Sequence, residues 1–269
     1  MFKIEAGRGY MMPAHFGPRY IGPGTSGWYH DVTAMTVPFL TDREKLSALL
    51  PPRFSVAEEA IVSVYFACNK RVDWLAGRGY NMIGVNASVV YTGETERLEG
   101  SYSLVIWENL ADPILTGREV QGIPKIFADM PDHSINSGVW RANASHYGHP
   151  IIDLEISGLR APELEEIAAA HEAQKGRDNP MSWRFISPTA LGESGLDEYL
   201  TFPSENKISK IQVGEGKLNW NTLTWEQNPT QFHIVNTLAA LPILEYRPAM
   251  VTHGAANLAL PDRPTRVLR

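Results

Sequence analysis

Residues 117–125 read Gly117-Arg118-Glu119-Val120-Gln121-Gly122-Ile123-Pro124-Lys125. The stretch is charged, although the segments on both sides of it are apolar. One interpretation is an exposed loop whose charged side chains are simply hydrated. The other is a functional turn.

The segments around this stretch are short and rich in β-branched or aromatic residues, with turn signals between many of them. The 22 Gly and 19 Pro residues also argue against a bundle of long helices. The pattern therefore favours an antiparallel barrel or sandwich with a few helices. The predicted strands are 60–67, 83–91, 101–106, 138–145, 151–156, 183–186, 208–213, 217–224 and 241–246.

Helices are predicted in two places. At 41–50 the spacing of a capping box precedes a leucine stripe, and two prolines end the segment. At 162–175 acidic residues occupy the first turn and apolar residues recur at helical spacing. A third short helix is predicted at 194–199, and 214–216 is predicted to connect a hairpin.

The order Gly-Arg-Glu, a short spacer, then Pro-Lys resembles the signature of the acetoacetate decarboxylase superfamily. In that family the lysine forms a Schiff base, and it matches Lys125. More loosely, Thr41-Asp42, Leu46 and Pro51 fall where the family has a helix ended by proline, so the resemblance covers roughly 29–247. It implies a mainly antiparallel α+β fold, a closed β-barrel or cone with a few peripheral helices, and a homo-oligomer of tetramer size or larger.

No linker divides the chain. Residues 1–28 are predicted to form an irregular N-terminal arm, because 15–27 contain several Gly and Pro residues and little apolar periodicity. Residues 29–269 are predicted to form one domain.

Schiff-base chemistry needs a neutral amine, whereas a hydrated lysine has a pKa near ~10.4. Lowering that pKa by about three units requires about 4 kcal/mol, from desolvation and a nearby cation. Acetoacetate decarboxylase is itself the standard example of this device. Decarboxylases of the family have a second lysine after the Schiff-base lysine, where this chain has Ile126. They also have glutamates on earlier strands, where this chain has Val64 or Tyr65, and Arg78. Both departures favour the family's pyruvate aldolase-dehydratases over its decarboxylases.

Three residues are predicted to be catalytic. Lys125 forms the Schiff base. Gln121, four residues earlier, would share a face with it in an extended segment and orient water or a hydroxyl. Tyr246 is the candidate for proton transfer, because the aldolase-dehydratases have a functional tyrosine near the C-terminus; its alternative is a sheet aromatic with a satisfied hydroxyl.

Four residues are predicted to bind substrate. Arg78 would grip a carboxylate, and its alternative is a hydrated turn residue. Arg118 and Glu119 would hold the loop and tune the lysine. Trp74 would line a pocket for an aromatic substrate, although most tryptophans belong to the core.

Other classes of function fit less well. The formal charge of −6, without a basic cluster, disfavours nucleic acid as a partner. The single cysteine, Cys68, excludes an intrachain disulfide and is expected to be a buried, inert thiol. Neither a signal peptide nor a membrane span is apparent, so a cytoplasmic protein is predicted. The histidines lack metal-site spacing; His133, His146 and His149 remain a weaker alternative, and no metal is predicted.

The sequence therefore predicts a lyase that forms a Schiff base with a small 2-oxo or 3-oxo acid, performs aldolase-dehydratase or hydratase chemistry, and needs no cofactor because the iminium is the electron sink. Its partners would be the keto acid and, in condensation, an aldehyde. Decarboxylation of a β-keto acid is the main alternative. A non-catalytic barrel that binds carboxylic acids, with Lys125 as a counter-ion, is the alternative from another class.

Overall fold

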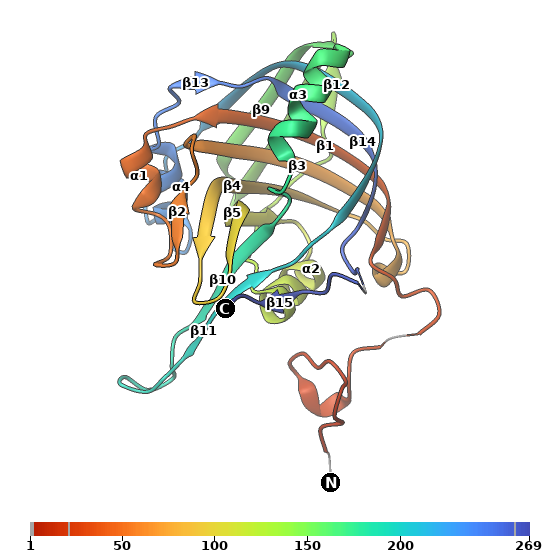
Figure 1. The fold of residues 1–269 in the computed structure, drawn as a ribbon, viewed down its shortest axis with the longest axis vertical. Helices are drawn as coiled ribbons and strands as arrows, with labels where there is room; N and C mark the ends of the chain where they lie inside the picture. The colour runs from red at the N-terminus through yellow and green to blue at the C-terminus, as the bar shows by residue number, and fades with distance from the viewer. Residues whose placement is uncertain (1–2, 21, 261) are drawn as a thin grey trace.

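The computed structural model describes residues 3–20, 22–260 and 262–269. Its main feature is one strongly curved sheet with small helices around its outside (Figure 1). The strand order is β15-β11-β10-β5-β4-β3-β1-β14-β12-β9-β8-β7, with β13 on β1, β2 on β4 and β6 on β5. All pairings are antiparallel except β5 with β6 and β5 with β10. The predicted mainly antiparallel fold is thus confirmed.

The strands are β1 (Trp28–Leu40), β2 (Phe54–Val56), β3 (Ile61–Val72), β4 (Tyr80–Thr92), β5 (Arg97–Glu108), β6 (Lys125–Phe127), β7 (Ser134–Asn136), β8 (Val139–His146), β9 (His149–Arg160), β10 (Pro180–Ile186), β11 (Leu196–Thr201), β12 (Glu205–Trp220), β13 (Glu245–Tyr246), β14 (Ala249–Asn257) and β15 (Arg266–Val267). The helices are α1 (Arg43–Ser47), α2 (Ala111–Thr116), α3 (Leu164–Gln174) and α4 (Phe232–Ala239), with single turns η1 (Ala14–Phe16), η2 (Asp73–Leu75) and η3 (Gly117–Gln121).

The curvature gives the sheet a cone shape. In the described strand order, β15 and β7 stand at opposite ends and do not pair with each other, so the cone is not closed by hydrogen bonds. Its interior is apolar, because alternate residues of each strand point to the same face. On β3 and β4 these residues include Val64, Phe66, Ile83 and Val85, all fully buried.

The two longer helical predictions are confirmed. α1 begins after Asp42, whose carboxylate accepts a hydrogen bond from the backbone of Lys45 at 2.8 Å. α3 begins with a capping box between Glu163 and Glu166. Both N-termini thereby satisfy backbone N–H groups that have no partner inside the helix.

Two local predictions are wrong. Residues 194–199 are not helical, since Leu196–Thr201 form β11 and pair with β10. Residues 214–216 do not connect a hairpin, because they lie inside the continuous strand β12, beside a register shift. The glycine there permits close packing: a Cβ on Gly216 would lie 2.7 Å from Val37 Cγ1.

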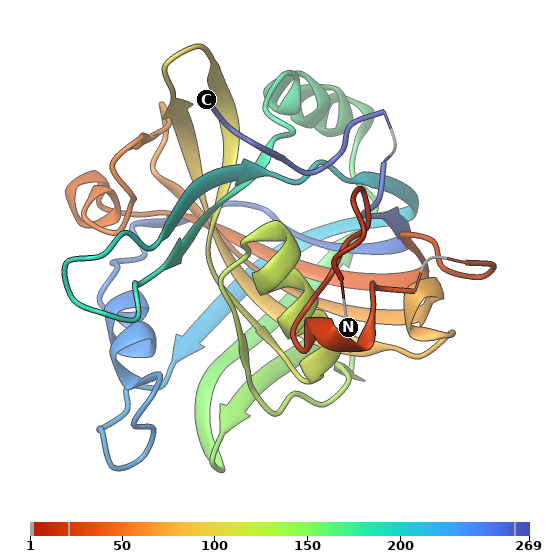
Figure 2. The same cartoon turned by 90° about the horizontal axis from the view of Figure 1, so that it is seen from below.

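At one end of the cone, the N-terminal arm lies beside α2 and η3 (Figure 2). The backbone N–H of Met12 donates to Glu119 Oε2 at 3.0 Å, and the Thr116 hydroxyl lies 3.7 Å from Met11 Sδ. The arm therefore covers the same end of the sheet as residues 117–125. In the described part of the chain, no helix is long and apolar enough to cross a membrane.

Candidate active site

A cavity of about 750 Å³ lies between the sheet, the α2–η3 segment and the N-terminal arm. Its sheet wall includes Tyr65, Met82, Asn86 and Ile106, which alternate with the residues that form the apolar core. The cavity is therefore on the opposite face of β3 and β4 from that core. Its other walls include Pro113, Thr116, Gly117, Val120, Gln121, Ile123 and Lys125.

Lys125 opens β6 and pairs with Ile106 of β5. The chain reaches it through α2, the π-helical turn η3, and Gly122, whose φ of 65° is a conformation that favours glycine. The Arg118 guanidinium donates to the Lys125 carbonyl at 3.0 Å. Gly117 leaves room for the amine, since a Cβ there would lie 2.4 Å from Lys125 Cδ. The turn thus directs the lysine side chain toward the cavity and holds its backbone.

The Lys125 amine is buried beside a carboxylate. Lys125 is 7% exposed and Glu108 is fully buried, and Nζ lies 2.8 Å from Glu108 Oε1. Nζ also donates to the Pro113 carbonyl at 3.2 Å. Burial raises the pKa of Glu108, and its ion pair with Lys125 acts in the opposite direction. Glu108 Oε2 has no hydrogen-bond partner in the described part of the chain. This oxygen is therefore free to accept a proton.

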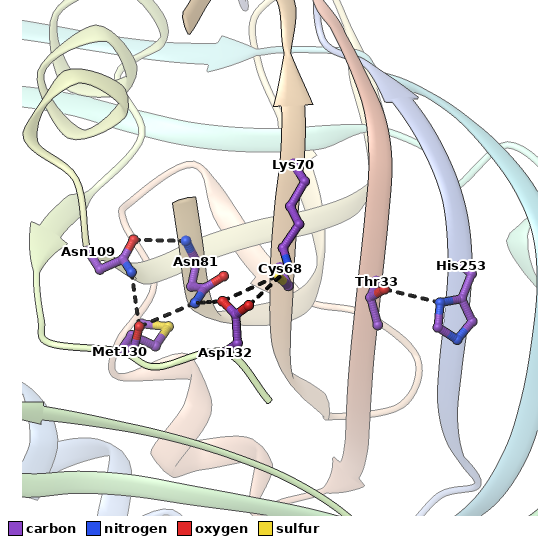
Figure 3. Close-up of polar contacts among 8 residues, drawn as sticks. All are labelled: Thr33, Cys68, Lys70, Asn81, Asn109, Met130, Asp132 and His253. Atoms are coloured by element: carbon purple, nitrogen blue, oxygen red, sulfur yellow. Dashed lines mark hydrogen bonds and ion pairs between the residues drawn. The ribbon is translucent and has the colours of Figure 1, made fainter. Parts of the chain in front are cut away.

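A polar network fixes the end of β5 that carries Glu108 (Figure 3). The next residue, Asn109, accepts from the backbone of Asn81 at 2.8 Å and donates to the Met130 carbonyl at 2.9 Å. Asn81 in turn donates to Asp132 at 2.9 Å, and Asp132 pairs with Lys70 at 3.0 Å. The network joins β3, β4 and the segment after β6 around this strand end. It therefore anchors Asn109, the residue next to Glu108 in the chain.

Cys68 lies at the same network, with Sγ 3.6 Å from Asp132 Oδ1, and is buried. Burial, followed by the nearby Asp132 charge, raises the pKa of the thiol to about 11. The thiolate is therefore scarce at neutral pH, as expected for an inert cysteine. Thr33 and His253, bonded across β1 and β14, are drawn in the same view.

Aromatic hydroxyls form another part of the wall. Trp74 Nε1 donates to the Tyr29 hydroxyl at 3.1 Å, and the Tyr29 and Tyr80 hydroxyls lie 3.2 Å apart. Tyr65 lies against Gly84 on the neighbouring strand, where any Cβ would meet its ring. Burial raises the pKa of all three tyrosines, so they stay protonated at neutral pH and can donate hydrogen bonds.

Three of the seven predicted site residues line the cavity: Lys125, Gln121 and Trp74. The predicted extended segment from Gln121 to Lys125 is wrong, because Gln121 ends the π-helical turn and Gly122 reverses the chain. Both side chains nevertheless reach the same cavity.

The other four predicted residues have different contacts. Arg118 bonds the Lys125 backbone and Glu119 bonds the arm. Arg78 is exposed, lies outside the cavity lining, and donates to the Leu75 carbonyl at 3.3 Å, as a turn residue would. Tyr246 also lies outside the lining, is 37% exposed, and its hydroxyl accepts from the Leu218 N–H at 3.1 Å.

Sequence reasoning missed Glu108 and the tyrosines at 29, 65 and 80. One signal for Glu108 was present: it continues the apolar strand before residues 117–125, on the same face as Ile106. A carboxylate at a buried strand position requires a partner, and Lys125 is the cation that β6 brings there.

The fold is a curved antiparallel sheet, and the site is a cavity lined by Lys125, whose carboxylate partner Glu108 is buried behind the wall. Residues 11–255 match the model of the acetoacetate decarboxylase (ADC) family, and the chain belongs to this family. The resemblance found in residues 117–125 is confirmed.

Solved structures share the fold at low sequence identity. An acetoacetate decarboxylase from Legionella pneumophila is 16% identical, with a TM-score of 0.72, over 94% of this chain and 92% of that one. An acetoacetate decarboxylase-like enzyme from Sphingomonas wittichii RW1 is 15% identical, with a TM-score of 0.67, over 93% and 98%.

The enduracididine biosynthesis enzyme MppR, complexed with the condensation product of pyruvate and imidazole 4-carboxaldehyde, is 15% identical, with a TM-score of 0.65, over 98% and 97%. None of the curated protein sequences matches the chain. At these identities the solved structures establish the fold alone.

Proposed function

We propose that the protein is a lyase that forms a Schiff base between Lys125 and a small keto acid, and that it performs aldol and dehydration chemistry through the resulting enamine. The observation that carries the proposal is the buried Lys125–Glu108 pair, 2.8 Å apart, at the wall of a cavity of about 750 Å³. The MppR complex with a pyruvate condensation product supports this branch of the family.

Glu108 supplies the proton transfers at nitrogen. It accepts a proton from the Lys125 ammonium, and the neutral amine attacks the substrate carbonyl to give a carbinolamine. The protonated Glu108 then returns the proton to the carbinolamine hydroxyl, which leaves as water. The products are an iminium and a carboxylate, so charge and atoms balance. Decarboxylases of the family have a second lysine at the position of Ile126. In this proposal Glu108 instead makes the Lys125 amine neutral, by accepting its proton.

The carbon chemistry follows from the iminium. Glu108 is within hydrogen-bond distance of Nζ and is the candidate base that removes a proton from the carbon next to the iminium, which gives the enamine. Gln121 cannot exchange a proton, but its amide orients the oxygen of an aldehyde or a leaving hydroxyl. The protonated tyrosine hydroxyls donate to the oxygen where negative charge develops.

Decarboxylation of a β-keto acid is the second candidate. It is favoured by the apolar side chains of Ile106 and Ile123 near Lys125, because a poorly solvated carboxylate loses CO2 more readily. The same iminium would accept the electrons. CO2 release from acetoacetate, compared with the condensation of pyruvate and benzaldehyde, separates the two reactions.

Borohydride trapping tests the premise shared by both candidates. Pyruvate and acetoacetate should each give a reduced adduct that mass spectrometry locates at Lys125. The variant Lys125→Arg, which keeps the charge, should give no adduct and no turnover. Absence of any adduct in the wild type, under conditions that trap an acetoacetate decarboxylase, would contradict the proposal. Full ligand binding and function in Lys125→Arg would instead favour a non-catalytic binding protein.

A further inference from the structure

The charges at the cavity wall are all positive. Of the described residues that line it, only Lys125 and Arg19 are charged, and none is acidic. Lys125 has its carboxylate partner behind the wall, at Glu108. The remaining cation belongs to the N-terminal arm and faces the same space.

Among the residues that the structure describes, the Arg19 guanidinium has no partner. It makes no hydrogen bond or ion pair to any residue the structure describes, and only its backbone N–H is bonded, to the Gly9 carbonyl at 2.8 Å. Several other arginines do have partners; for example, Arg8 of the same arm lies 3.7 Å from Glu5, and Arg184 pairs with Glu198. Arg19 is half-buried. A guanidinium that loses hydration without gaining an acceptor is destabilised, so an anionic ligand would stabilise it.

The arm is attached to the cavity wall on both sides of Arg19. Before it, the Met12 N–H donates to Glu119 Oε2 at 3.0 Å. After it, the Ser26 hydroxyl donates to Asp73 Oδ2 at 2.6 Å. Gly9, Tyr20 and Thr25 also line the cavity. These contacts fix the arm as a wall of the site, and Arg19 is one of the residues that line it.

We infer that Arg19 binds the carboxylate of the substrate, and that the N-terminal arm is therefore part of the active site. A guanidinium binds a carboxylate through two parallel hydrogen bonds. The inference rests on the proposed function and specifies its substrate: a carbonyl compound with one carboxylate and an apolar body that lies along Tyr29, Trp74 and Phe202. Arg19 takes the role that the sequence assigned to Arg78.

A matched pair of probes tests the inference. 2-Oxo-4-phenylbutanoate and 4-phenyl-2-butanone share a carbonyl and an aromatic body, but only the first has a carboxylate. The measurement is the concentration of each that gives half-maximal borohydride trapping at Lys125. Arg19→Gln should raise this concentration about tenfold or more for the acid and leave it unchanged for the ketone. Arg19→Lys should retain part of the acid preference.

Arg8→Gln is the matched control, because Arg8 lies in the same arm outside the cavity lining, and both probes should behave as in the wild type. An equal change for acid and ketone in Arg19→Gln would show that Arg19 only shapes the arm, and no change for either would show that it does not bind the acid. Both outcomes overturn the inference.

Calorimetric titration with 4-phenylbutanoate separates this inference from the proposed function, because this acid has no keto group and cannot form a Schiff base. Arg19→Gln should weaken binding of this acid about tenfold or more, even if no probe forms a Schiff base. Equal binding by the wild type and Arg19→Gln would overturn the carboxylate role without bearing on Lys125.

Discussion

Gly117 determines where the Lys125 amine can lie. A Cβ on this residue would lie 2.4 Å from Lys125 Cδ, 2.5 Å from Cε and 3.0 Å from Nζ. These atoms are the flexible end of the lysine, so they can move while the backbone stays in place. A side chain at position 117 would therefore displace the Lys125 amine more than it would disturb the fold.

We predict that Gly117→Ala lowers the rate of borohydride trapping by about 100-fold, because a displacement of about 1 Å is enough to disturb the reacting geometry. The free energy of unfolding should change by about 1 kcal/mol or less, since glycine is a poorer helix former than alanine. Trapping kinetics and urea denaturation check the two parts. A large loss of stability together with lost trapping would show that the clash falls on the backbone instead.

At the scale of single residues, the local motif at 117–125 pointed to Lys125 and Gln121, and both line the cavity. Glu108 and Tyr80 could not be assigned in this way, because their roles depend on partners far away in the chain. Arg78 shows the reverse case: its alignment with a family carboxylate suggested the site, yet the turn after η2 leaves it in solvent.

The π-helical turn η3 links Lys125 to the arm. The Arg118 guanidinium donates a hydrogen bond to the Lys125 carbonyl. The next residue, Glu119, accepts a hydrogen bond from the Met12 N–H. One interpretation of the sequence treated Arg118 and Glu119 as hydrated loop residues. In the structure each of them makes a specific contact.

We predict that Glu119→Ala releases the arm without unfolding the sheet. Trypsin cleavage after Arg8 and Arg19 should become several-fold faster, because exposed, weakly attached segments are cut preferentially. Glu119→Gln is the matched control: its amide oxygen can still accept the Met12 N–H and should keep cleavage near the wild-type rate. Equal cleavage in all three proteins would show that this hydrogen bond does not retain the arm.

At the scale of elements, predictions succeeded where the signal was local. The capping residues of α1 and α3 lie next to the helices they start. β1 and β14 were not predicted, since His30, Asp31 and Pro38 interrupt the apolar pattern of β1 and small residues fill β14. The glycines of β12 suggest a turn, whereas Gly216 is required by close contact with β1 and β14.

At the scale of the molecule, the fold class follows from many short strands and frequent turn residues, but the position of the cavity does not. It depends on which sheet face α2, η3 and the arm cover, and that is determined by long-range contacts. Homo-oligomeric assembly, cytoplasmic location and the division at residue 28 stay predictions.

The Lys125–Glu108 pair also affects the stability of the whole protein. Burial raises the pKa of Glu108 above its ordinary value of 4.5, and removal of the Lys125 cation leaves only that effect. In Lys125→Met the folded state therefore binds the Glu108 proton more tightly than the unfolded state. The stabilisation from this proton is complete below pH 4.5 and is lost as the pH rises through the raised pKa.

We predict that urea denaturation of Lys125→Met gives a free energy of unfolding that falls from pH 5 to pH 8 relative to the wild type, by about 3–5 kcal/mol when the carboxylate is fully ionised. The double variant Glu108→Met with Lys125→Met should lose this pH dependence and be as stable as the wild type, or more stable by about 1–4 kcal/mol, because no charge remains to be desolvated. A double variant less stable than Lys125→Met at pH 8 would contradict this account, since it would mean that the pair holds the fold together. If the double variant is instead at least as stable as the wild type, the Lys125–Glu108 pair lowers the free energy of unfolding, as expected of a pair whose role is chemical.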